Sequence, residues 1–121
     1  MIEKKNFYIN GKWVSPTKPN DFEVINPSTE EAFAIISLGS AEDADKAINA
    51  AKIAFETWRE TTKEERLALL EKFDEIYKRR WDEMVEAQSK EMGAPLDFAS
   101  ETHTKMGADI CRNNIEILKN F

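Results

Sequence analysis

The spacing of apolar residues changes once along this chain, at Gly39, and the change divides the sequence into two kinds of secondary structure. Before Gly39, short runs of aromatic and β-branched residues alternate with turn-forming residues, as is typical of β-strands. After Gly39, apolar residues recur with the period of an amphipathic helix. We therefore predict a β region over residues 1–38 and a mainly α-helical region over residues 39–121.

The β region is expected to be a small antiparallel sheet. Asn10 and Gly11 separate two short apolar runs within residues 7–14, and both tolerate the positive φ of a tight hairpin turn. An extended pattern resumes over residues 22–25. It is interrupted by the turn sequence Asn26-Pro27-Ser28-Thr29 and continues over residues 32–38.

About four helices are expected after Gly39, and two of them have well-marked beginnings. Ser40 is placed to cap the first helix, where Asp43 adds negative charge at the positive end of the helix dipole. Thr62 followed three residues later by Glu65 is a capping-box pattern, which predicts that the second helix begins there.

The later helix boundaries depend on single residues. Asp82 offers another N-cap, so the long apolar run is divided near Trp81. Gly93 suits the left-handed conformation after a helix end, and Pro95 prevents that helix from continuing. A fourth helical run is predicted over residues 98–121. It contains no clear stop signal, so we expect the natural polypeptide to continue.

Composition and charge exclude several classes of function. The 121 residues are 41% hydrophobic and 33% charged, which is typical of a folded domain, and the net charge of -6 disfavours nucleic-acid binding. No apolar segment is long enough for a signal peptide or a membrane span, so we expect a cytoplasmic protein that binds no membrane. With Cys111 as the only cysteine, no intramolecular disulfide can form.

No residue type occurs in a pattern that predicts catalysis. Cys111 lies on the apolar side of a helical pattern, where burial would make its thiol unreactive. His103 has no second ligand at metal spacing and is expected at the surface. Local helix capping explains the paired carboxylates Glu64, Glu65, Asp82 and Glu83.

Cofactor binding is not predicted either, because the pyrophosphate of a dinucleotide requires closely spaced glycines at the start of a helix. The four glycines are widely separated: Gly11, Gly39, Gly93 and Gly107. A set of aromatic residues at helical spacing is interpreted as a packing face: Phe55, Trp58, Phe73, Tyr77 and Trp81.

Five segments, in this order, resemble the opening of NAD(P)-dependent aldehyde dehydrogenases. They are Ile9-Asn10-Gly11-Lys12-Trp13, Asn26-Pro27-Ser28-Thr29-Glu30-Glu31, Ala50-Ala51-Lys52-Ile53-Ala54-Phe55 with Trp58, Arg66-Leu67, and Glu91-Met92-Gly93-Ala94-Pro95. The resemblance implies an α/β parent fold, of which residues 1–121 would form the N-terminal part of the cofactor-binding domain. In that family a thiolate attacks the aldehyde, hydride passes to NAD or NADP, and a glutamate activates water.

No residue here matches that catalytic or cofactor-binding machinery, so the chain alone is expected to be inactive and to bind no cofactor. The resemblance does imply one weaker site. Some family members hold a cation with backbone carbonyls before the Asn-Pro turn and with an acidic side chain before the Gly-x-Pro segment. These positions are Val24, Ile25 and Glu91 here.

Two hypotheses about function follow. In the first, the chain is the N-terminal part of an enzyme that oxidises an aldehyde to a carboxylic acid with NAD or NADP. Its partner would then be the rest of the aldehyde dehydrogenase polypeptide or a second copy, and only the full-length enzyme would bind the aldehyde. In the second, the chain is a small stand-alone helical module for binding or oligomerisation.

Overall fold

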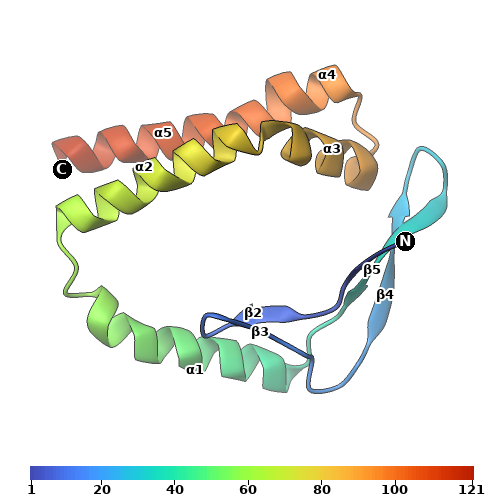
Figure 1. The fold of residues 1–121 in the computed structure, drawn as a ribbon, viewed down its shortest axis with the longest axis horizontal. Coiled ribbons are helices and arrows are strands. Elements are labelled where there is room, and N and C mark those ends of the chain that lie inside the picture. The colour runs from blue at the N-terminus through green and yellow to red at the C-terminus, as the bar shows by residue number, and fades with distance from the viewer. The chain divides into compact units, whose positions relative to one another are not determined.

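A computed structural model describes residues 1–121, which form two compact units, Met1–Glu60 and Thr61–Phe121. The first unit contains five strands and one helix, as drawn in Figure 1. In chain order they are β1 (Ile2–Lys4), β2 (Phe7–Ile9), β3 (Lys12–Val14), β4 (Asp21–Asn26), β5 (Glu31–Ser37) and α1 (Ala41–Trp58). The change from strands to helices occurs between β5 and α1, as the periodicity predicts.

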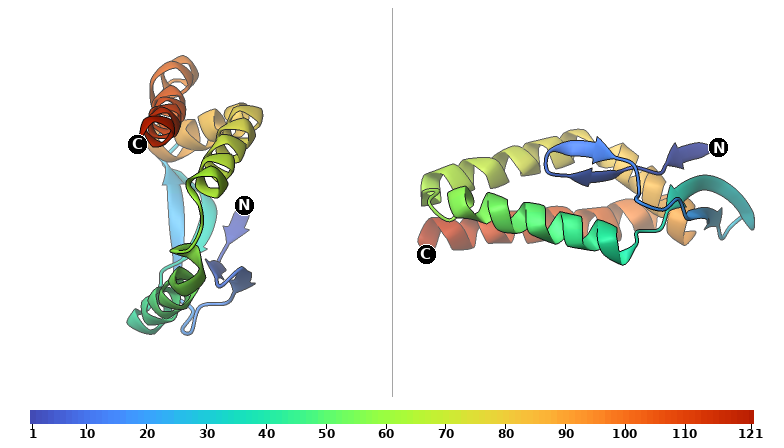
Figure 2. Two further views of the ribbon diagram at one scale, coloured as in Figure 1. Left: turned by 90° about the vertical axis from the view of Figure 1, so that its left-hand side faces the viewer. Right: turned by 90° about the horizontal axis from the view of Figure 1, so that it is seen from below.

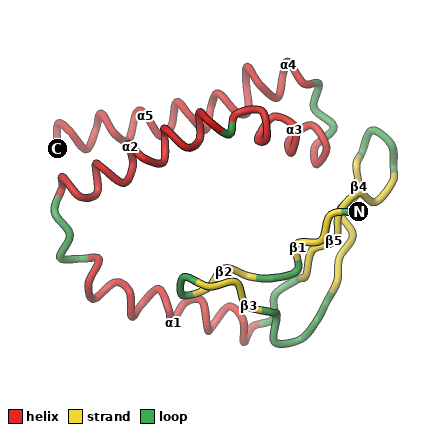
Figure 3. The backbone as a smooth tube through the Cα atoms, viewed as in Figure 1, coloured by secondary structure: helices red, strands yellow, loops and turns green.

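The predicted hairpin is confirmed as the antiparallel pair β2–β3, in which Phe7 lies opposite Val14 (Figure 3). Its turn residues Asn10 and Gly11 have φ values of 52° and 72°. Both values lie in the left-handed region that a tight hairpin turn requires. Local residue preference therefore accounts for this part of the fold.

The second sheet has the strand order β1-β5-β4 and is mixed. β4 and β5 pair antiparallel as predicted, whereas β1 pairs parallel with β5 and corrects the expectation of a purely antiparallel sheet. The sequence pattern did not predict β1, because its three residues are all exposed and do not alternate between apolar and polar. The register shifts between Val24 and Ile25, whose partners are Ala34 and Ala32, so Phe33 is an extra residue in β5.

The second unit is helical throughout. Its elements are α2 (Lys63–Arg79), α3 (Trp81–Met92), α4 (Leu96–Phe98), the π-helix η1 (Ala99–Thr104) and α5 (Lys105–Asn120). The predicted capping box of Thr62 and Glu65 is present at the start of α2. The predicted fourth run corresponds to α4, η1 and α5 together, although its periodicity did not reveal the π-helical turn.

The break between α2 and α3 is confirmed, but Asp82 is not its N-cap. The N-cap is Arg80, which makes no side-chain capping bond, and Asp82 lies in the first turn of α3. Only Arg80, with φ of -100° and ψ of 21°, leaves helical geometry here, so the helix has already restarted at Trp81. Gly93 ends α3 in the left-handed conformation predicted for it, with φ of 69°.

The core of the second unit lies where α2 and α5 run side by side, an arrangement visible in Figures 1 and 2. Its buried residues include Ala108, Cys111 and Ile115 of α5, together with Ala99 and Thr104 of the adjoining η1, and all of these except Ile115 are small. Small side chains allow two helix backbones to approach closely. No helix of the chain combines the length and the apolar character needed to cross a membrane.

The prediction that the aromatic set forms a core is wrong for three of its members. Phe55, Trp58 and Phe73 are 55%, 44% and 54% exposed. Tyr77 and Trp81 are half-buried and stack edge to face at 6.3 Å. Helical spacing identifies an apolar face correctly, but it cannot tell whether the chain itself contains the element that would cover that face.

Candidate functional site

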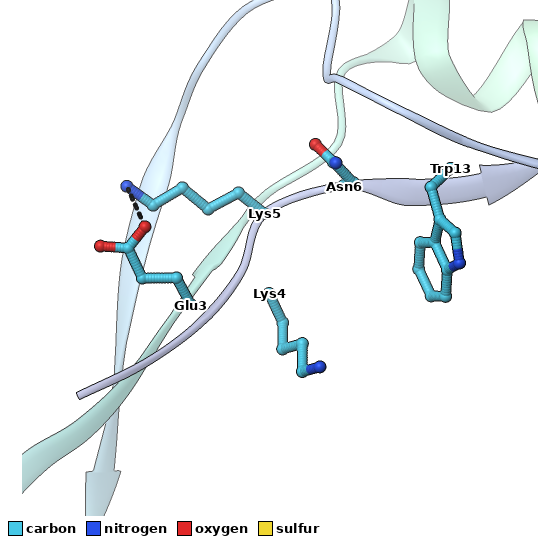
Figure 4. A pocket seen from close by; sticks show the side chains of 5 residues that line it. All are labelled: Glu3, Lys4, Lys5, Asn6 and Trp13. Carbon is cyan, nitrogen blue, oxygen red and sulfur yellow. Dashed lines mark ion pairs between the residues drawn. The ribbon is translucent and has the colours of Figure 1, made fainter.

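A hollow of about 520 Å³ lies beside the first strand (Figure 4). It is lined by Glu3, Lys4, Lys5, Asn6 and Trp13. The Lys5 ammonium lies 3.9 Å from Glu3, and its hydrogen bond to an aspartate in β4 raises the pKa of the lysine. Lys5 and Glu3, which both line the hollow, thus form a surface ion pair, as is typical of a solvated surface.

Asp43, at the start of α1, is the most strongly hydrogen-bonded carboxylate of the first unit. Its Oδ1 accepts bonds from the backbone N–H and the hydroxyl of Thr17, at 2.9 and 2.7 Å. Its Oδ2 accepts bonds from the backbone N–H and the hydroxyl of Ser40, at 2.9 and 2.7 Å. These bonds, first that from the Thr17 hydroxyl, hold the pKa of Asp43 far below its ordinary value of 3.8.

The same geometry closes the first helix to an incoming phosphate. A helix N-terminus binds anions through its free N–H groups, but here the Asp43 carboxylate already supplies the negative charge. Gly39 is the only glycine between β5 and α1, and a Cβ at that position would lie 3.6 Å from the ring of Phe7. These residues do not fit a dinucleotide pyrophosphate.

In the second unit, polar side chains join α2 and α3 to the π-helical turn. The Tyr77 hydroxyl donates a hydrogen bond of 3.1 Å to the Thr104 carbonyl oxygen, and the Trp81 indole donates one of 3.0 Å to the Ser100 hydroxyl. A Cβ on Gly107 would come within 2.5 Å of the Tyr77 oxygen. This close approach explains why position 107 is a glycine. The spacing of apolar residues in the sequence gives no sign of the contact.

Cys111 lies where the sequence predicts, buried between α2 and α5. Its side chain is 8% exposed, and its thiol points to the Leu70 carbonyl oxygen at 3.8 Å. Burial, followed by the negative charge of Asp74, raises the pKa of the Cys111 thiol. A thiol in this setting is a packing group and a poor nucleophile.

His103 is less exposed than predicted, because the π-helical turn directs it against a neighbour. Its ring meets Phe98 edge to face at 5.0 Å, and its Nδ1 is buried without a hydrogen-bond partner. No group of three or more His, Cys, Asp or Glu side chains is placed to hold a metal ion. His103 is therefore an aromatic packing residue in this structure.

The residues of the predicted cation site lie in different units. Val24 and Ile25 flank the register shift of β4, in the first unit. Glu91 is exposed in the last turn of α3, in the second unit. The cation site stays a prediction.

Comparison with known proteins gives one consistent result. The sequence model of the Aldehyde dehydrogenase family matches residues 13–121. Among curated proteins, a 3-succinoylsemialdehyde-pyridine dehydrogenase from a Pseudomonas species is 45% identical over 96 residues, which are 79% of this chain and 20% of that protein.

Solved structures agree over almost the whole chain. An aldehyde dehydrogenase from Bartonella henselae matches with a TM-score of 0.98 and 54% identity, over 100% of this chain and 25% of that one. A mutant of aldehyde dehydrogenase C from Pseudomonas syringae, in complex with NAD+ and octanal, matches with a TM-score of 0.94 and 35% identity, over 97% and 24%. The chain thus spans only about a quarter of these relatives.

Proposed function

Because this chain belongs to the aldehyde dehydrogenase family, we propose that it is the N-terminal part of the cofactor-binding domain of an NAD(P)-dependent aldehyde dehydrogenase. The complete enzyme would oxidise an aldehyde to a carboxylic acid. The 121 residues alone would be inactive and would shape the domain rather than react.

The observation that carries this proposal is the match at a TM-score of 0.98 to one quarter of a complete aldehyde dehydrogenase. Relatives in complex with NAD+ support a nicotinamide cofactor for the complete enzyme. The closed start of α1 and the buried Cys111 support the inactivity of this segment. A cytoplasmic location belongs to the same proposal and is supported by the single, buried cysteine.

A chimera tests the proposal. The matching N-terminal quarter of the Bartonella henselae enzyme is replaced by residues 1–121, and aldehyde-dependent formation of NADH is measured beside the parent enzyme and the isolated chain. We expect the chimera to retain activity and the isolated chain to show none. A chimera that is inactive or insoluble, or aldehyde oxidation by the isolated chain, would contradict the proposal.

A second candidate function is a stand-alone helical module for binding or oligomerisation. The observation in its favour is the large exposed apolar surface, which includes Ile48 and Ile53 of α1 at 64% and 74% exposure. Size-exclusion chromatography of the isolated chain separates the candidates. A discrete, soluble oligomer favours the module, whereas aggregation favours an incomplete part of an enzyme.

A further inference from the structure

The turn that joins β2 and β3 contains an asparagine with an unusual neighbour (Figure 3). Asn10 is the only asparagine in the chain that is followed by a glycine, and both Asn10 and Gly11 are exposed. Side-chain hydrogen bonds to the backbone hold Asn26, Asn114 and Asn120 in place. No such bond holds the amide of Asn10, so this side chain can turn toward its own backbone.

The backbone of Gly11 is accessible to that side chain. The β2–β3 ladder ends at the pair Ile9–Lys12, so the Gly11 N–H lies beyond the ladder. A Cβ on Gly11 would have no atom within 4 Å, which shows that the space beside this peptide group is open. Because glycine adopts a wide range of backbone angles, the peptide bond after Asn10 can rotate without a steric clash.

The hairpin is too small to lock its turn. Only three residue pairs join its strands, and the last of them, Ile9–Lys12, borders the turn directly. A two-stranded hairpin is only marginally stable by itself, and its end opens at a small cost in free energy. Opening of this one pair frees the Asn10–Gly11 peptide group to change its backbone angles.

We propose that Asn10 is a site of spontaneous deamidation, in which the backbone nitrogen of Gly11 attacks the side-chain Cγ of Asn10. This reaction is a chemical route by which asparagine is thermolabile in proteins. The inference is independent of the proposed function, because it depends only on the hairpin.

The reaction needs no reactant other than water. A bond forms between the Gly11 nitrogen and Cγ of Asn10, the bond between Cγ and Nδ2 breaks, and Nδ2 leaves as ammonia with the proton of the attacking nitrogen. The product is a cyclic succinimide. Water then opens the ring at either of its two carbonyl groups and leaves an aspartate or an isoaspartate at position 10, each with an added negative charge.

The two products affect the hairpin differently. Aspartate followed by glycine suits the same tight turn as asparagine followed by glycine. In isoaspartate the main chain runs through the former side chain, so the turn gains a methylene carbon and Ile9 no longer lies opposite Lys12. The hairpin packs on the start of α1 through Phe7, whose ring lies 3.6 Å from the position of a Cβ on Gly39. Isoaspartate should therefore loosen the first unit.

The rate of the reaction is the first test. The 121-residue chain is incubated at mildly alkaline pH, and mass spectrometry of its peptides follows every asparagine. Asn49 is the internal control, because it is also exposed but lies within α1 and precedes an alanine. We expect deamidation at Asn10 to be at least about tenfold faster than at Asn49, because attack requires a backbone that can reach the reactive geometry. Equal rates would overturn the proposal.

A matched variant tests the route of the reaction. Asn10→Gln keeps an amide at the turn but places it one methylene further from the backbone, so attack by the Gly11 nitrogen would need a larger ring. We expect position 10 of this variant to stay unmodified over the same period. Loss of ammonia from it at the rate of Asn10 would show that Gly11 is not the attacking group.

The thermal stability of the two products is the second test. Chromatography separates the isoaspartate form from the aspartate form, and Asn10→Asp provides the reference protein. We expect Asn10→Asp to melt with the unchanged chain and the isoaspartate form to melt at least about 3 °C lower. Equal midpoints for the isoaspartate form and Asn10→Asp would contradict the effect on the hairpin.

Discussion

At the scale of single residues, Asp43 makes contacts that its position in the sequence does not predict. Its charge was expected to favour the start of α1, whereas its carboxylate also fastens the loop at Thr17 to the helix. Four hydrogen bonds donated to a carboxylate favour its ionised form, so the strength of this contact depends on pH.

Asp43→Asn should lower the thermal stability of the chain at neutral pH, because an amide cannot accept all four bonds. The folded-state pKa lies below the ordinary value of 3.8, so the carboxylate stabilises the fold at pH values above about 4. This stabilisation is lost as the pH falls through the folded-state pKa. The thermal midpoints of the unchanged chain and of Asp43→Asn should converge as the pH is lowered from neutral to acid. Asp45→Asn, at an exposed position of the same helix, is the control. A difference in midpoint that stays constant with pH would contradict the prediction.

Cys111 should react slowly with thiol reagents in the folded chain, because burial raises the pKa of its thiol and blocks access. We expect the reaction at neutral pH to be at least about tenfold slower than in denaturant. A colorimetric thiol assay measures both rates. Equal rates would mean that the α2–α5 core opens readily or that the thiol is activated.

Gly107→Ala should destabilise the second unit by about 1 kcal/mol, because overpacking costs more than the gain in helix propensity. The added Cβ would meet the Tyr77 hydroxyl oxygen at 2.5 Å and displace it from Thr104. In a Tyr77→Phe background the same substitution should cost less. A double-mutant cycle from urea unfolding measures the difference, and additive effects would show that the two residues do not interact.

At the scale of secondary-structure elements, α5 combines a buried and an exposed side. Its most buried large side chain is Ile115, at 5% exposure, whereas Ile110 is 55% exposed. The two isoleucines share a helix and differ mainly in burial. They therefore form a matched pair for measuring what the contact with α2 contributes.

Ile115→Ala should reduce the free energy of unfolding by about 2–4 kcal/mol, because it removes buried methyl groups and leaves a cavity. Ile110→Ala should change the free energy of unfolding of the isolated chain by no more than about 0.5 kcal/mol. Urea unfolding followed by circular dichroism provides both values. Similar losses for the two variants would show that the outer side of α5 is packed in solution.

At the scale of the whole molecule, we propose that this chain alone does not bind the cofactor with which its relatives were solved. Its glycines are far apart, and Asp43 closes the start of α1. Cofactor binding would therefore require the remainder of an aldehyde dehydrogenase subunit.

Isothermal titration of the isolated chain with NAD and with NADP should show no saturable binding up to millimolar cofactor. The active chimera is the positive control, since it contains the rest of the cofactor-binding domain. A dissociation constant in the micromolar range for the isolated chain would contradict this expectation and would show that the chain contains a cofactor site of its own.

The amino-acid sequence by itself determined the features that depend on neighbours along the chain. Asn10 and Gly11 specify a hairpin turn, Ser40 and Thr62 cap their helices, and Gly93 ends one, because each acts on backbone groups within a few residues. The family is also recognisable from the sequence, because its five characteristic segments appear in order.

Only the tertiary structure decided what depends on residues far apart in the sequence. The parallel pairing of β1, the bonds from Thr17 to Asp43 and the contact of Tyr77 with Gly107 join residues that local periodicity treats as independent. The exposure of Ile110 and Ile117 is of the same kind. Periodicity identifies an apolar face, but whether it is buried depends on which other elements pack against it.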